Sequence, residues 1–127
     1  MKVFYPAVVH EEDGAYWVEF PDAPGCHTFA DTLEEAMESA KEALEGHIMG
    51  MLENGMQLPA ASGIKTVETD SDSFVTLVGA DLIDYEKCKA VKKTLTIPDW
   101  LNDMAVKQHI NFSQVLQQAL MEKVIRK

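Results

Sequence analysis

The sign of the charge reverses once along the chain, and this reversal divides the 127 residues into two small modules. Residues 1–86 hold 18 Asp and Glu against three Lys, a formal net charge of −15. Residues 87–127 hold eight Lys and Arg against three acids, a formal net charge of +5. A reversal of this size predicts that the two modules have different partners. The acidic module should attract a basic partner, whereas the basic module should attract nucleic-acid phosphates.

The acidic module has the pattern of an α+β domain. Four segments rich in β-branched and aromatic residues are predicted strands: 2–10, 15–20, 26–30 and 74–78. After the third of these, apolar residues recur at three- and four-residue steps over 33–52, which predicts an amphipathic helix. Thr32 and Glu35 have the spacing of a capping box at its start. The order β-β-β-α-β predicts an antiparallel sheet with one helix across a face.

No pattern in the acidic module indicates catalysis. The sequence contains no HExxH, GxSxG or Gly-rich phosphate loop, and His10, His27 and His47 do not have the spacing of a ligand set. The acids fall mainly on the outer face of the predicted helix and in turns, where charge runs are usually solvated. We therefore expect no enzyme activity, no catalytic residue, no metal and no cofactor. A nuclease, the alternative, would need several acids to converge on a metal in the sheet.

The sequence has the character of a cytoplasmic protein. No apolar run approaches the roughly 20 residues that a membrane helix needs. The first residues, MKVFYPAVVHEED, lack the pattern of a signal peptide because acids follow a short apolar run at once. Cys26 and Cys88 are not arranged as a CxxC pair, so we expect two reduced thiols, a cytoplasmic location and no membrane association.

Two motifs of the acidic module resemble those of HicB-type antitoxins. The first is DGAYWVEFPDAPGC at 13–26, and the second is DTLEEA at 31–36, where the predicted helix starts. The likeness continues to 59–62, PAAS, where the family usually carries a Pro-x-Pro-Ser element, although the second proline is missing here. The resemblance covers the whole chain in order, and the two motifs are correctly spaced.

This resemblance implies a fold and a partner. HicB N-terminal domains have a partial ribonuclease-H-like fold without its catalytic acids. They bind a small basic HicA toxin, a ribonuclease with a double-stranded-RNA-binding fold and a catalytic histidine. The residues of this chain agree on two points, since the module is acidic and shows no pattern of an active site.

The basic module has a different pattern, a strand followed by two short helices. Residues 91–97, VKKTLTI, alternate between two faces, and Pro98 ends this predicted strand. A short helix with one apolar face follows, and 109–111 is the predicted turn. Asn111 can cap a second helix that carries an apolar stripe from Phe112 to Val124. These elements, about 37 residues, cannot bury enough apolar area to fold alone, so something must pair with the strand.

The order strand–helix–helix resembles the ribbon-helix-helix family, in which two chains pair their strands and interlock their helices. The resemblance implies a homodimer whose core contains Leu95, Ile97, Leu101, Val115, Leu116 and Leu120. It also implies a two-stranded ribbon in the major groove of operator DNA. The turn between the helices often carries Gly in this family, whereas this chain has His109, for which a left-handed conformation is costly. A helix-turn-helix domain, found in other HicB proteins, is disfavoured by the strand pattern.

Position by position, the resemblance implies a set of DNA-binding residues. On the ribbon they are Lys92, Lys93, Thr94 and Thr96, and at the start of the second helix they are Asn111, Phe112 and Ser113. Lys92, Thr94 and Thr96, which share one face of the strand, would face the groove, and the helix amides would hold a phosphate. Taken singly, such residues are also ordinary strand formers or solvated edge charges. Together with the +5 charge and the expected dimer, they favour DNA contact.

These inferences predict an antitoxin of a type II toxin–antitoxin system. It would neutralise a HicA-type mRNA ribonuclease with residues 1–86 and repress its own operon through residues 87–127. The alternative is a stand-alone ribbon-helix-helix transcription regulator whose N-terminal domain senses a small molecule or only oligomerises. A small basic partner encoded beside the gene would favour the antitoxin.

Overall fold

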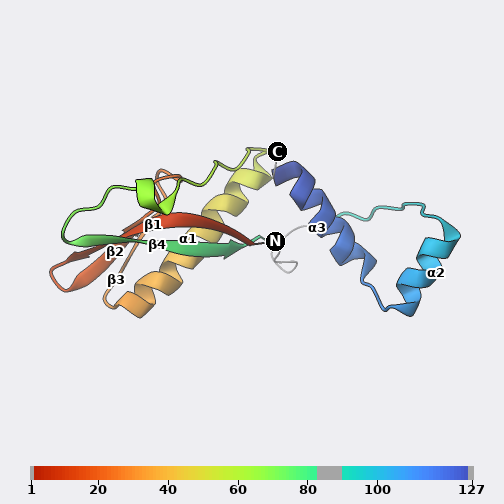
Figure 1. The fold of residues 1–127 in the computed structure, drawn as a ribbon, viewed down its shortest axis with the longest axis horizontal. Coiled ribbons are helices and arrows are strands. Elements are labelled where there is room, and N and C mark those ends of the chain that lie inside the picture. The colour runs from red at the N-terminus through yellow and green to blue at the C-terminus, as the bar shows by residue number, and fades with distance from the viewer. Residues whose placement is uncertain (1, 83–89, 126–127) are drawn as a thin grey trace. The chain divides into compact units, whose positions relative to one another are not determined.

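The fold is seen in a computed structural model, which describes residues 2–82 and 90–125 (Figure 1). The chain forms two compact units: Lys2–Leu82, called here the acidic unit, and a second that contains residues 90–125, called the basic unit. The relative position of the two units is not determined, so each is described by itself. The predicted boundary between residues 86 and 87 lies outside the described residues, as does Cys88.

The acidic unit is a four-stranded antiparallel sheet with one long helix. Its elements, in chain order, are β1 (Lys2–Glu12), β2 (Ala15–Glu19), β3 (His27–Ala30), α1 (Leu33–Glu53), the 3-10 turn η1 (Ile64–Thr66) and β4 (Ser73–Asp81). The strand order across the sheet is β3-β2-β1-β4. The predicted α+β arrangement with an antiparallel sheet is confirmed, and β1 and β4 both extend further than the sequence pattern predicted.

The hairpin between β1 and β2 closes on two residues with left-handed backbone conformations. Asp13 has φ 53° and Gly14 has φ 79°, and Glu12 pairs with Ala15 on either side of them. A turn with positive φ at both central residues matches the natural twist of the two strands. This turn also sets which residues of β1 bond to β2, because hydrogen-bonded pairs alternate along an antiparallel ladder.

A proline lies inside β1, although β1 is a central strand. Even-numbered residues of β1 bond to β2, as the hairpin turn requires, and odd-numbered residues bond to β4; the Glu11 N–H, for example, donates to the Asp72 carbonyl at 3.1 Å. Pro6 therefore turns its nitrogen toward the β2 side. The pairing with β2 ends at Val8 and Glu19, so the missing N–H of Pro6 interrupts no ladder bond.

The core of the acidic unit lies between α1 and the sheet. Helix residues spaced by four are fully buried: Ala36, Ala40, Leu44 and Ile48. They meet a sheet face whose buried side chains include Ala7, Val9, Val18, Val78 and Ala80. The two alanines early in the helix let its backbone approach the sheet closely, while the larger side chains fill the space farther along.

Both ends of α1 are capped, and the cap at its start uses the predicted Thr32. At the start, Thr32 Oγ1 accepts a hydrogen bond from the Glu35 N–H at 3.2 Å. At the end, Gly55 has φ 71°, its N–H donates to Leu52, and the Met56 N–H donates to the Met51 carbonyl at 2.9 Å. This pair of bonds is a Schellman motif, which explains why the helix stops at Asn54-Gly55.

The basic unit contains two helices, α2 (Asp99–Lys107) and α3 (Phe112–Ile125). Residues 90–98 have no regular secondary structure, so the predicted strand over 91–97 is not formed within one chain. The physical reason is that a strand requires a neighbouring strand for its ladder, and no other strand of the described residues pairs with this segment. The turn between α2 and α3 holds His109 at φ 56°, the left-handed conformation that the sequence analysis considered.

The basic unit has almost no interior of its own. Among its described residues only Ala105 is buried, at 9% exposure. Its exposed large apolar residues are Val91, Leu95, Ile97, Trp100, Leu101, Met104, Val106, Ile110, Phe112, Val115, Leu120 and Val124. An exposed apolar surface of this extent is typical of a surface that another chain covers.

Candidate functional site

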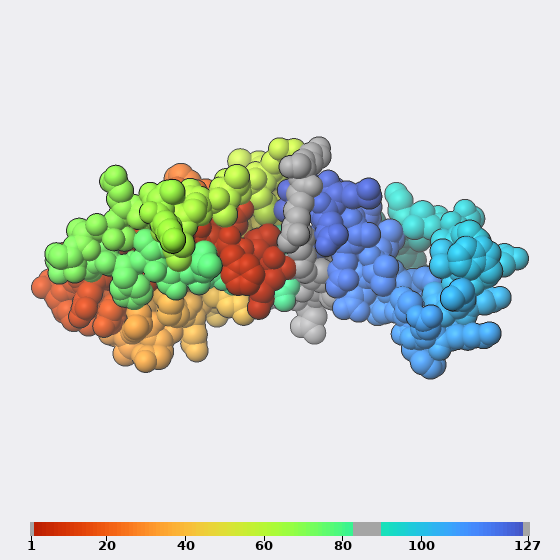
Figure 2. All heavy atoms as spheres, viewed as in Figure 1, coloured from red at the N-terminus to blue at the C-terminus, as the bar shows by residue number. Residues whose placement is uncertain are grey.

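Two motifs that lie 40 residues apart in the sequence are bonded to each other in the acidic unit. Asp22, in the loop between β2 and β3, accepts the Ser62 N–H at 2.8 Å and the Ser62 hydroxyl at 2.5 Å. The Tyr5 hydroxyl donates to the Pro59 carbonyl at 2.7 Å. Burial, and then the neighbouring Asp22 carboxylate, raise the pKa of Tyr5. The loop over 56–72, green in Figure 2, is thereby held against the sheet without the second proline of the family element.

The loop that follows β2 is shaped by its own turns and by burial. The Ala23 N–H donates to the Phe20 carbonyl and the Cys26 N–H to the Ala23 carbonyl, both at 3.0 Å. Gly25 has φ 89°, which favours glycine at this position of the motif. Phe20, Ala23 and Cys26 are buried. Burial raises the pKa of the Cys26 thiol, so this cysteine stays neutral and behaves as a small apolar residue.

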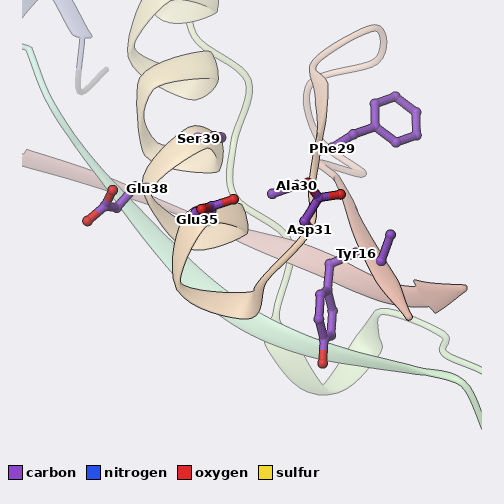
Figure 3. Close-up of a pocket in the computed structure, with 8 residues that line it drawn as sticks. Tyr16, Phe29, Ala30, Asp31, Glu35, Glu38 and Ser39 are labelled. Atoms are coloured by element: carbon purple, nitrogen blue, oxygen red, sulfur yellow. The ribbon is translucent and has the colours of Figure 1, made fainter. Parts of the chain in front are cut away.

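A hollow lies between β3 and the first turns of α1, and we call it the acidic hollow. Its lining residues are Ala15, Tyr16, Phe29, Ala30, Asp31, Glu35, Glu38 and Ser39. Asp31 lies in the short connection between β3 and α1, Glu35 lies in the first turn of α1, and Phe29 points away from α1 (Figure 3). Three carboxylates around one open space create a site that favours a positively charged side chain.

A second hollow lies on the other face of β3, and we call it the apolar hollow. Its lining residues are Trp17, Glu19, Phe20, Pro21, Pro24, Gly25, Cys26, His27 and Phe29. The Trp17 ring stacks on His10 with centroids 3.8 Å apart and an angle of 9° between the planes. His10 Nε2 also lies 3.4 Å from Glu19 Oε1. These contacts hold the Trp17 ring in one orientation, so one wall of this hollow is preformed.

The acidic residues that the structure describes are not gathered into a metal-binding cluster. No group of three or more His, Cys, Asp and Glu in residues 2–82 and 90–125 could hold a metal ion. The acidic residues of α1 instead spread along its exposed face, with Glu34, Glu38 and Glu42 all exposed. Within the same residues, no helix is long and apolar enough to cross a membrane.

The predicted DNA-binding residues all lie on the surface of the basic unit. Lys92, Lys93, Thr94 and Thr96 are exposed in the segment that lacks regular structure. Asn111 is the N-cap of α3, since its Oδ1 accepts the Gln114 N–H at 3.1 Å. Phe112 and Ser113 follow it in the first turn of α3 and are exposed. The helix α2 separates the ribbon residues from this helix terminus along the chain.

The predicted dimer-core residues are also uncovered within one chain. Leu95, Ile97, Leu101, Val115 and Leu120 are exposed by 42–58%, and Leu116 is half-buried. These values describe the surface of a single copy, so the assignment to a dimer core stays a prediction. The bonds from Ser62 to Asp22 and the two hollows beside β3 were not predicted from the sequence, because no local pattern links residues so far apart.

Comparison with known proteins identifies the family of the chain. Residues 5–120 match the family described as HicB_like antitoxin of bacterial toxin-antitoxin system. An uncharacterised 14.9 kDa protein of Haemophilus phage HP1, from the rep-hol intergenic region, is 39% identical over 99 residues, which are 76% of this chain and 74% of that protein. Antitoxin HicB of Pseudomonas fluorescens is 32% identical over 73 residues, which are 58% of this chain and 48% of that protein.

Solved structures have a similar fold. A chain of a toxin-antitoxin complex from Streptococcus pneumoniae has a TM-score of 0.60 and 29% identity, with 97% of this chain and 99% of that chain covered. The antitoxin HicB of Burkholderia pseudomallei has a TM-score of 0.62 with 95% and 98% covered, and its 24% identity supports the fold alone. Because the family match spans nearly the whole sequence, this chain belongs to the HicB-like antitoxin family of bacterial toxin–antitoxin systems.

Proposed function

We propose that the chain neutralises a HicA-type ribonuclease toxin with its acidic unit and represses its own operon with its basic unit. The observation that carries this proposal is the division of charge between the two units. The described residues 2–82 contain 16 Asp and Glu and three Lys, a formal net charge of −13. A ribonuclease must hold an RNA backbone on a positive face, and an acidic protein can occupy that face in place of RNA.

The toxin-binding role needs no chemistry from this chain. An antitoxin that covers the RNA-binding face of a toxin acts by exclusion, so we propose that the chain is not an enzyme. Two structural neighbours are described as toxin-antitoxin complexes, one from Streptococcus pneumoniae and one of HicA3 with HicB3, which supports a toxin as the partner. Both targets, mRNA and operator DNA, are in the cytoplasm, where this function places the protein.

The DNA-binding role requires two copies of the chain. The exposed apolar side chains of the basic unit and the unpaired segment over 91–97 are the surfaces that a ribbon-helix-helix dimer would cover. Pairing two such segments would form the strand that one chain lacks and direct Lys92, Thr94 and Thr96 toward one groove. We keep the boundary between the functions at residues 86 and 87, and the ribonuclease-H-like description of the acidic unit stays a prediction.

Two measurements on the full chain test this function. The first is RNA cleavage by the basic protein encoded beside the gene, titrated with this chain at several salt concentrations. We expect cleavage to stop near one equivalent, with faster association at low salt. Cleavage that continues at a large excess of the chain would contradict the antitoxin role and favour the stand-alone regulator.

The second measurement is binding of the chain to DNA from its own promoter. The triple variant Lys92→Ala, Thr94→Ala, Thr96→Ala should lose discrimination between operator and unrelated DNA while it remains a dimer. The single variant Lys92→Ala should weaken binding to every sequence and lower the salt slope by about one unit if the lysine contacts phosphate. Unchanged operator affinity of the triple variant would contradict the assignment of these residues.

A further inference from the structure

The strand β3 ends the sheet and turns part of its backbone outward. The Phe20 N–H donates to the Cys26 carbonyl at 3.3 Å, and bonded pairs alternate along the ladder from there. Thr28 and Ala30 therefore bond to β2, whereas His27 and Phe29 direct their N–H and C=O groups away from the sheet. An edge with free donors and acceptors can accept an additional strand from another protein.

The two hollows lie on opposite faces of this same edge. Cross-strand partners point to one face of a sheet, so Tyr16 and Ala30 face the acidic hollow, whereas Trp17 and Phe29 face the apolar hollow. Phe29 is 70% exposed and contributes to the lining of both hollows. A strand that paired with β3 would carry its own side chains alternately over the acidic and the apolar hollow.

The charge of the unit indicates which kind of strand fits. Asp31, Glu35 and Glu38 around the acidic hollow favour lysine or arginine at every second position of the incoming strand. A second copy of this chain would instead bring another unit of charge −13 against these carboxylates. The structure therefore favours a basic partner over self-association at this edge.

We propose that β3 is the docking edge for an extended segment of the basic toxin, with basic and apolar residues alternating along that segment. Backbone bonds from His27 and Phe29 hold the segment, and the two hollows select its side chains. This inference rests on the proposed function, because it names the surface of the acidic unit on which the toxin binds. It assigns no role to the opposite edge of the sheet, β4, where Leu77 is 54% exposed.

Hydrogen exchange on the complex of the full chain with the toxin tests the backbone pairing. Binding should slow exchange at the amides of His27 and Phe29, while the amides of Val75 and Leu77, which β4 directs outward, should be unaffected. Protection of β4 without protection of β3 would overturn the proposal while leaving the antitoxin function intact. If the unmodified chain does not bind the toxin at all, the proposed function itself is wrong.

Charge variants with a matched control test the acidic hollow. Asp31→Asn with Glu35→Gln should raise the dissociation constant for the toxin at least about tenfold, because both carboxylates would lose a cationic partner. The control, Glu42→Gln with Glu45→Gln, removes the same charge from the same unit outside the hollow. It should change the constant by less than about threefold, as peripheral charges usually do. Equal effects in the two double variants would show that only net charge matters and would overturn the site.

Two variants of exposed apolar residues test the apolar hollow. Phe29→Ala should weaken toxin binding by about tenfold, since an exposed aromatic residue at the centre of an interface is a typical anchor. Leu77→Ala removes a similarly exposed apolar side chain from the opposite edge and should leave binding unchanged. Circular dichroism should show the same fold for all four variants, and weaker binding by Leu77→Ala alone would overturn the proposal.

Discussion

The two units place their apolar residues in opposite ways. The acidic unit covers Leu44, Ile48 and Val9 completely with residues from the same chain. The basic unit also has two helices that carry apolar side chains, yet among its described residues only Ala105 is buried. The difference shows that an amphipathic pattern predicts which face of a helix is buried. It does not predict whether residues of the same chain or of another chain bury that face. Four experiments can sharpen or break this comparison.

The largest effect is expected in the closed core of the acidic unit. Leu44→Ala should lower the free energy of unfolding of this unit by about 2–5 kcal/mol, because the residue is fully buried and leaves a cavity. The loss should not depend on protein concentration. Leu33→Ala, at the exposed start of α1, is the control and should have a much smaller effect. Denaturant unfolding followed by circular dichroism measures both, and similar losses would mean that Leu44 is not part of a closed core.

A smaller effect, dependent on concentration, is expected in the basic unit. Leu120→Ala should destabilise the paired state by about 2 kcal/mol if a second copy covers this side chain. The melting temperature of the basic unit should rise with protein concentration, both in the unmodified chain and in the Leu120→Ala variant. A transition independent of concentration, together with no loss from Leu120→Ala, would mean that the exposed apolar face is not a dimer interface.

The contact between the two motifs should contribute less. Asp22→Ala removes the acceptor of both bonds from Ser62 and should lower the stability of the acidic unit by about 1 kcal/mol. Ser62→Ala keeps the backbone donor and should cost less than Asp22→Ala. Thermal unfolding of the two variants gives this comparison, and the opposite order would show that the backbone bond is unimportant.

The smallest effect is expected at the turn of the basic unit. His109 has φ 56°, a conformation that costs a residue with a Cβ about 1–2 kcal/mol relative to glycine. His109→Gly should therefore stabilise the basic unit by about 0.5–1 kcal/mol, because part of the relief is offset by the freer unfolded chain. His109→Ala retains the Cβ and should bring no gain, so stabilisation by alanine would point to the imidazole rather than the backbone.

Local patterns predicted most of the acidic unit, because its turns and caps are encoded by neighbouring residues. Asp13-Gly14, Thr32 with Glu35, and Asn54-Gly55 each act within a few positions of the element that they start or stop. The predicted end of the last strand was too early, since β4 continues through Gly79 to Asp81. The Phe4 ring lies over Gly79 so closely that an added Cβ would be 2.7 Å from a ring carbon. Glycine is disfavoured inside strands, but this close packing leaves no room for a larger residue at position 79.

Contacts between distant residues and between chains could not be predicted in the same way. The bond from Ser62 to Asp22 and the hollows beside β3 depend on how the loop and the strands fold together, which periodicity does not encode. The segment over 91–97 has the alternation of a strand, but its pairing partner is absent from the described chain. The sequence therefore predicts that this segment can pair as a strand, but within one chain it does not form one.

Pro6 affects the loop between β2 and β3 as well as its own strand. If the pairing of β1 with β2 continued by two further positions, Pro6 would face Pro21, and neither residue could donate a hydrogen bond. The hairpin therefore cannot lengthen beyond this point, and the chain after Phe20 is forced to leave the sheet. Two prolines, 15 positions apart in the sequence, act together as a stop for the ladder. That stop determines where the loop with Asp22 begins, and so where β3 can return as the outer edge.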